Sequence, residues 1–182
     1  MGKIHQKIIP AARRIADLDA IMKAGYEYAM MLQIHMAQLK HVVDMAHAHR
    51  VKLILHADLI QGLRSDEHGV QYLCQEIQPD GIISTHSQVI ETARKRGVLT
   101  IQRIFLLDSH SLETSYRVIR SMQPDYIEVL PGIIPELIQE VFQETRMPIL
   151  AGGFLRTPLQ VKQALDAGAT AVTTSNRDLW KL

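Results

Sequence analysis

Two stretches near the C-terminal end decide the fold. Residues 148–153 are Pro-Ile-Leu-Ala-Gly-Gly, and residues 171–176 are Ala-Val-Thr-Thr-Ser-Asn. Each is an apolar β-type run with a small or polar ending, and two such runs about twenty residues apart are typical of the last two strands of a TIM barrel. Glycines let a backbone approach its ligand, and the helix that follows offers unpaired N–H groups, so the two turns predict a phosphate-binding site. The candidate phosphate ligands are Gly152, Gly153, Thr174, Ser175 and Asn176.

Short apolar runs of the β type recur along the whole chain. Segments with helical periodicity separate them, such as 87–96, which is stopped by Gly97, and 159–167, which is stopped by Gly168. Regular alternation of strand and helix predicts a parallel sheet. The predicted strands cover residues 8–12, 29–32, 53–57, 81–84, 99–104, 126–130, 149–151 and 171–173.

Eight strand–helix units must fit into 182 residues. That is about 23 residues per unit, against roughly 30 in a typical TIM barrel, so some helices must be short or missing. Segment 17–24 allows only a short helix, whereas 36–49 and 135–145 allow full-length ones. We therefore predict an α/β fold, a compact TIM-type (β/α)8 barrel formed by a single domain over residues 1–182. An open doubly wound sheet is the alternative, and the count of eight with the paired turns disfavours it.

Composition indicates one soluble globular domain, with 47% hydrophobic and 21% charged residues. No run approaches the roughly 18 apolar residues of a membrane helix, and the N-terminus lacks a signal-peptide core, so we expect a cytoplasmic protein without a membrane partner. Cys74 is the single cysteine, which excludes an internal disulfide. Without a second thiol or clustered histidines nearby, we expect no metal and no cofactor.

The overall charge gives little support to a nucleic-acid partner. There are 20 basic and 19 acidic residues, and aromatic residues make up 5% of the chain, so a basic coat and stacking platforms are not evident. The weak candidates for RNA contact are the adjacent Arg94, Lys95 and Arg96. The favoured interpretation of that cluster is a solvated helix C-terminus that complements the helix dipole.

Alternation along the predicted third strand places chemistry at the mouth of the barrel. Leu53 and Leu55 would face the helices, which leaves His56 and Asp58 facing inward, with Asp58 at the strand end. We favour ligand contact for Asp58. His56 is either a proton carrier or a buried residue satisfied by its surroundings, and the second is favoured.

The same alternation on residues 126–130 points Glu128 into the barrel. A buried acid needs a partner, and the candidates are Arg13, Gln102 and Arg103. For Glu128 and Arg103, a buried ion pair between strands and contact with a ligand are equally supported. The repeated Gln-Pro-Asp at 78–80 and 123–125 is interpreted as a device that stops a helix and turns the chain.

Several longer motifs are more specific than the phosphate turns. Together they resemble the glycerol uptake operon antiterminator family, and the resemblance extends from residue 9 to residue 182. These motifs are Asp-Leu-Ile-Gln-Gly at 58–62, residues 101–109, residues 124–132, Ala-Gly-Gly at 151–153 with Arg156 and Thr157, and residues 167–176.

The resemblance implies a bacterial regulator without catalytic activity. Its effector ligand would be glycerol 3-phosphate, and its partner the leader mRNA of a glycerol-catabolic operon, in which it promotes read-through of a terminator. The phosphate would lie on the two C-terminal turns, while Asp58 and Glu128 accept hydrogen bonds from the glycerol hydroxyls. Ordering of the loops at the mouth and a change in a homo-oligomer are two hypotheses for how the ligand affects RNA binding.

One departure from the family pattern is His86, where a lysine is expected after Ser84-Thr85. A histidine neutralises phosphate only when it is protonated, so this replacement would lower the affinity for a phosphorylated ligand near neutral pH. The alternative function is a small TIM-barrel phosphosugar-metabolising enzyme (isomerase, aldolase or synthase) with Glu128, Asp58 or His56 as acid and base. The sequence offers neither a strand-placed lysine for a Schiff base nor a convincing metal cluster for it.

Overall fold

The structure is a computed structural model and describes residues 4–182. Eight parallel strands form a closed barrel in the order β1-β10-β9-β8-β7-β6-β4-β2, and closure follows because β1 pairs with both β2 and β10. The predicted barrel is thus confirmed and the open doubly wound sheet is excluded. The strands are β1 (Ile8–Ala12), β2 (Tyr28–Met31), β4 (Lys52–His56), β6 (Gly81–Ser84), β7 (Leu99–Phe105), β8 (Tyr126–Leu130), β9 (Ile149–Gly152) and β10 (Ala171–Thr174).

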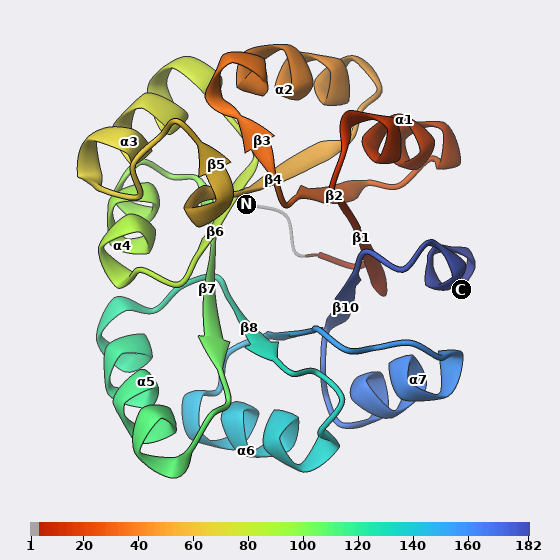
Figure 1. Cartoon of the computed structure of the whole chain (residues 1–182). Helices are drawn as coiled ribbons and strands as arrows, with labels where there is room; N and C mark the ends of the chain where they lie inside the picture. The colour runs from red at the N-terminus through yellow and green to blue at the C-terminus, as the bar shows by residue number, and fades with distance from the viewer. Residues whose placement is uncertain (1–3) are drawn as a thin grey trace.

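Helices surround the barrel on its outside (Figure 1). Some helices are short or missing, as expected, but the short helix predicted at 17–24 is wrong, because α1 starts at Ile15 and has ten residues, as many as α2. The shortening falls elsewhere. The helix α3 has six residues before a π-helical segment, Leu73–Ile77, and a 3-10 turn, Arg177–Lys181, replaces a helix after β10. Within residues 4–182, no helix is long and apolar enough to cross a membrane. The α-helices are α1 (Ile15–Ala24), α2 (Leu39–Ala48), α3 (Glu67–Tyr72), α4 (Ser87–Lys95), α5 (Ser109–Met122), α6 (Pro135–Thr145) and α7 (Pro158–Asp166).

Side chains alternate between the barrel interior and the helix layer as the sequence predicts. Leu53 and Leu55 of β4 pack in a cluster with the helices, whereas Ile54 belongs to the cluster that fills the barrel. Ile127 and Val129 of β8 likewise pack outward, which leaves Glu128 inside. The alternation matters for function because it determines which polar residues reach the mouth.

The repeated Gln-Pro-Asp motif has the structural role expected of it. Gln78 and Gln123 end their helices in the left-handed conformation, with φ of 59° and 50°. Asp80 then accepts a hydrogen bond of 2.8 Å from the backbone N–H of Leu53, and Asp125 accepts one of the same length from that of Thr100. Each motif therefore stops a helix and ties the next strand to its neighbour.

A second, two-stranded sheet lies beyond the barrel strands and was not predicted. It pairs β3 (Ile34–His35) in parallel with β5 (Ile60–Gln61), which follow β2 and β4 along the chain. Strands of two residues leave no periodic signal in a sequence, so this sheet was missed. It forms part of the carboxyl face of the barrel, where the connections after the strands gather (Figure 1).

Candidate functional site

A pocket of about 270 Å³ opens at the carboxyl ends of the strands. This is the end at which TIM barrels carry their sites. Seven of the ten residues expected at the site line the pocket, namely Arg13, Arg103, Glu128, Gly153, Thr174, Ser175 and Asn176. The other lining residues are Ala11, Met30, Leu32, Leu59, Leu130, Phe154, Leu155 and Thr173.

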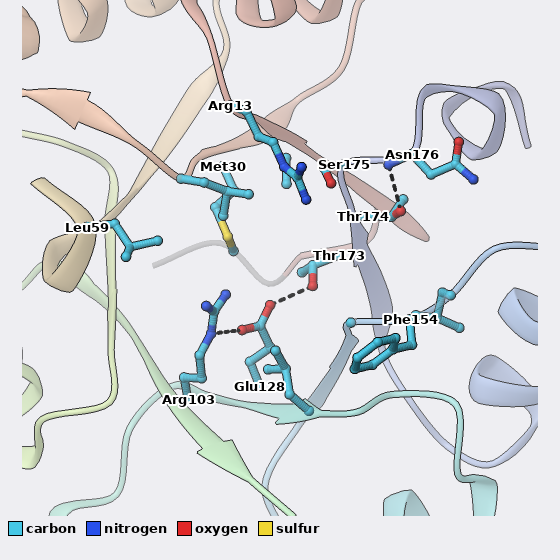
Figure 2. A pocket seen from close by; sticks show the side chains of 15 residues that line it. Arg13, Met30, Leu59, Arg103, Glu128, Phe154, Thr173, Thr174, Ser175 and Asn176 are labelled. Carbon is cyan, nitrogen blue, oxygen red and sulfur yellow. Dashed lines mark hydrogen bonds and ion pairs between the residues drawn. The ribbon is translucent and has the colours of Figure 1, made fainter.

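The floor of the pocket is a buried ion pair. Arg103 Nε donates to Glu128 Oε2 at 2.5 Å, and the Thr173 hydroxyl donates to Glu128 Oε1 at 2.5 Å (Figure 2). Glu128 is fully buried. Of the three partners considered for Glu128, the structure selects Arg103, and because this pair also lines the pocket, the ion-pair and ligand-contact interpretations apply together. Thr173 was not anticipated, although its inward position follows from the alternation of β10.

Gly152 has a steric role beneath the pocket rather than a place in its wall. A Cβ added at this position would lie 2.6 Å from Thr173 Oγ1 and 3.0 Å from Glu128 Oε1. Only a residue without a side chain leaves room for the buried carboxylate and its donor. Direct contact of Gly152 with a ligand therefore stays a prediction.

The rim after β9 carries an exposed aromatic side chain. Gly153 and Phe154 both have positive φ, 78° and 60°, and Phe154 is 67% exposed although it is apolar. A left-handed conformation costs a non-glycine residue roughly 1–2 kcal/mol. Figure 2 shows the Phe154 ring beside the pocket, so the turn holds an aromatic group at the mouth. No motif or periodicity in the sequence points to this residue.

The turn after β10 divides its polar groups between structure and pocket. Asn176 is the N-cap of the 3-10 turn: its side chain accepts from the Asp178 N–H at 3.1 Å, and its own N–H donates to Thr174 Oγ1 at 3.1 Å. Asn176 therefore has a structural role as a cap in addition to its place in the pocket lining. The Ser175 hydroxyl and the Arg13 guanidinium have no hydrogen-bond partner within residues 4–182, and Figure 2 shows Arg13 reaching toward Ser175.

Asp58 lies at the mouth but is engaged elsewhere. Its carboxylate accepts hydrogen bonds from the Ser84 hydroxyl, from the Thr85 N–H at 2.7 Å and from the Thr85 hydroxyl at 2.8 Å. Burial raises the pKa of Asp58, but these donors outweigh burial and hold the pKa below its ordinary value. Asp58 is not among the residues that line the pocket, and its contact with a ligand stays a prediction.

His56 and Gln102 are also outside the pocket wall. His56 is 3% exposed, and its Nδ1 has no hydrogen-bond partner among the described residues. Burial and the Arg103 charge lower the pKa of His56 to about 4, so the ring is neutral near pH 7. Gln102 turns toward the helix layer, where its amide donates to the Thr85 carbonyl at 2.9 Å, so Arg103 is the inward residue of this pair.

The remaining basic candidates lie away from the pocket. Arg94 and Lys95 are in the last turn of α4 and Arg96 is its C-cap, at the barrel end opposite the mouth, and Arg94 donates to the Met122 carbonyl at 2.6 Å. His86 precedes α4 and is not a lining residue of the pocket. Among residues 4–182 there is no group of three or more His, Cys, Asp or Glu placed to hold a metal ion.

The family model of the glycerol-3-phosphate responsive antiterminators matches residues 8–180. The chain belongs to this family. A solved glycerol uptake operon antiterminator regulatory protein from Listeria monocytogenes str. 4b F2365 is 45% identical, with a TM-score of 0.96, and the match covers 100% of this chain and 98% of that one. The whole barrel, including both C-terminal turns, is therefore shared with that antiterminator.

Two further relatives are more distant. The uncharacterized protein YgcP of Escherichia coli (strain K12) is 29% identical over 96% of this chain and 92% of its own. A solved antiterminator-related protein from Thermotoga maritima MSB8 is 24% identical, with a TM-score of 0.86, over 98% of this chain and 100% of that one. A putative deoxyribose-phosphate aldolase from Coccidioides immitis is 13% identical, with a TM-score of 0.71, and the match covers 98% of this chain and 85% of that one. This likeness shows a shared fold only.

Proposed function

We propose that the pocket binds glycerol 3-phosphate as an effector and that the liganded antiterminator acts on the leader mRNA of a glycerol-catabolic operon to promote read-through of a terminator. One observation carries the ligand assignment: the pocket combines the guanidinium of Arg13, which has no partner within residues 4–182, with a fixed carboxylate, Glu128. Arginine suits phosphate, and the remaining lone pairs of Glu128 suit hydroxyl groups. A small phosphorylated polyol presents both groups.

The state of Glu128 supports recognition rather than catalysis. Both of its oxygens already accept hydrogen bonds, one from Arg103 and one from Thr173. A carboxylate held in this way is well placed to orient a hydroxyl group of a ligand. We therefore assign Arg13 and Ser175 to the phosphate and Glu128 with Arg103 to the glycerol hydroxyls, in a regulator without catalytic activity.

A second candidate function is a small phosphosugar isomerase, aldolase or synthase. The buried His56, with its unpartnered Nδ1 near the charge of Arg103, is the observation that favours it. Incubation with triose and pentose phosphates, followed by ³¹P NMR, tests this function directly. Turnover that is lost in His56→Gln would support the enzyme, and unchanged spectra would leave the regulator.

Calorimetry with two matched glycine variants tests the ligand pocket. Gly153→Asp places a carboxylate at the mouth, while Gly25→Asp makes the same change at the same φ of 78°, with open space around it, in the turn after α1. Glycerol 3-phosphate should bind wild type and Gly25→Asp and lose at least about tenfold in affinity for Gly153→Asp, because the new charge repels phosphate. Equal affinities for the two variants would contradict the pocket.

Transcription in vitro tests the regulatory half. On a template with the leader of a glycerol-catabolic operon, wild-type protein with glycerol 3-phosphate should increase the yield of read-through transcript. Gly153→Asp should not, and Gly25→Asp should behave as wild type. Tight ligand binding without any change in read-through would support the proposed ligand site and contradict the proposed antitermination.

A further inference from the structure

A second pocket opens beside the first, and its lining is rich in amides. Its volume is about 380 Å³, and it is bordered by the start of α1 and by the small sheet of β3 and β5. None of its lining residues in the described part of the chain carries a carboxylate. The polar lining residues are Arg13, Arg14, Gln33, His35, Gln38 and Gln61.

The polar groups of this pocket are open to a ligand. The side chains of Gln33, Gln38 and Gln61 are exposed and have no hydrogen-bond partner within residues 4–182. His35 lies opposite Gln61 in the parallel register, and its Nδ1 accepts from the Ala37 N–H at 3.2 Å. In the neutral ring this bond places the proton on Nε2, which makes that atom a donor. The pocket therefore offers both donors and acceptors.

This chemistry suits an unpaired nucleobase with its phosphates. A glutamine amide matches the N6 and N7 edge of adenine, and proteins recognise RNA sequence mainly on unpaired bases whose edges are accessible. The guanidinium groups of Arg13 and Arg14 suit adjacent phosphates. Ile15, which is half-buried, is the apolar lining residue with accessible surface, and a base can lie against it.

Charge near the pocket is compatible with a polyanion. The neighbouring acid is Asp17, whose carboxylate accepts from Arg14 at 3.3 Å and from Arg177. Burial raises the pKa of Asp17, but the hydrogen bonds from Arg177 and Arg14 outweigh burial and lower it to about 2. One carboxylate is thus shared by two exposed arginines. Arg13 donates its backbone N–H to the same carboxylate at 3.2 Å, whereas its guanidinium has no carboxylate partner within residues 4–182.

We infer that this amide pocket is a binding site for single-stranded RNA that holds one unpaired base, with adenine the best match. The inference rests on the proposed function and adds the surface through which it acts. Arg13 lines both pockets. A ligand phosphate on Arg13 fixes a guanidinium that also borders the RNA site, so the effector changes RNA affinity without a large rearrangement of the barrel.

Isosteric charge variants test the RNA site. RNA is first selected from a random single-stranded pool on wild-type protein with saturating glycerol 3-phosphate, and its affinity is then measured by fluorescence anisotropy. Gln38→Glu and Gln61→Glu should each weaken binding by about tenfold, because a carboxylate repels phosphate and loses the amide donor. Gln139→Glu, the same change on the exposed surface of α6, should stay within about twofold.

The outcomes separate this inference from the function beneath it. Glycerol 3-phosphate should bind all four proteins alike, since no variant lies in the ligand pocket. If wild type selects RNA and the two pocket variants bind it as Gln139→Glu does, the amide pocket is wrong and the antiterminator stands. If wild type binds glycerol 3-phosphate but enriches no RNA, the RNA half of the proposed function fails and the RNA site fails with it.

Photo-crosslinking gives a test that needs no variant. Selected RNA that contains the photoreactive analogue 8-azidoadenosine in place of adenosine is irradiated on wild-type protein, and adducts are located by mass spectrometry. Adducts on residues 33–38 or on Gln61 are expected. Adducts confined to residues 94–96, at the opposite end of the barrel, would overturn the assignment.

Discussion

Two carboxylates lie near the top of the barrel, and they differ in almost every respect that matters for binding. Glu128 of β8 is fully buried, is paired with Arg103 and lines the ligand pocket. Asp58, after β4, accepts three hydrogen bonds from Ser84 and Thr85 and does not line the pocket. A place at the end of a strand is therefore not enough to assign a ligand contact. The partners of a carboxylate decide what it can still bind.

The difference also separates two kinds of stabilisation. Glu128 is held by a charged partner, so its removal leaves the Arg103 guanidinium, whose side chain is only 12% exposed, without a counter-charge. Asp58 is held by neutral donors, the buried Ser84 hydroxyl and two groups of the half-buried Thr85, so its removal leaves no charged donor among them without a partner.

The largest expected effect is that of Glu128→Ala. Loss of one partner from a buried ion pair typically costs about 3–5 kcal/mol, and the free energy of unfolding should fall by that amount. Urea denaturation measures it. Asp58→Ala should cost less, about 1–3 kcal/mol, because it leaves neutral donors only. Equal losses in the two variants would break the comparison.

His56, near both Arg103 and Asp58, should make stability depend on pH. Its pKa is about 4 in the folded protein, below the ordinary 6.5, so between these values the unfolded chain binds a proton that the folded protein does not. Stability should therefore fall by about 3 kcal/mol as the pH drops from 6.5 to 4. Urea midpoints across this range should show a shallower slope for His56→Gln. Parallel curves would argue against a neutral buried ring.

Gly152→Ala tests the packing around Glu128. The added Cβ would lie 2.6 Å from Thr173 Oγ1, so the buried network must shift, at a cost of about 1–3 kcal/mol. Thermal unfolding should show a lower midpoint. Gly168→Ala, where φ is 103° and nothing lies within 4 Å of the added Cβ, is the control for backbone strain without crowding. A milder effect at Gly152 than at Gly168 would contradict the steric role.

The smallest expected effect is that of Asp58→Asn on the ligand. Its affinity for glycerol 3-phosphate, measured by calorimetry, should change by no more than about twofold, because Asp58 does not line the pocket. The affinity of Glu128→Gln, measured in the same way, should fall by about tenfold. If Asp58→Asn loses as much as Glu128→Gln, the ligand reaches the Ser84 and Thr85 side of the mouth, and the original assignment of Asp58 is restored.

Local patterns in the sequence were enough to predict the order of strands and helices and which side chains of each strand face inward. Apolar runs between helix stops predicted all eight barrel strands, and alternation alone placed Glu128 inside, because the two faces of a barrel strand meet different surroundings. The tertiary structure alone decided which residues became neighbours. Arg103 pairs with Glu128, and His35 lies beside Gln61, across 25 and 26 residues of chain. The direction of a side chain along a strand is a local property of the backbone. Which side chains become partners depends on the closure of the barrel and on segments, such as β3 and β5, that are too short to carry a periodic signal.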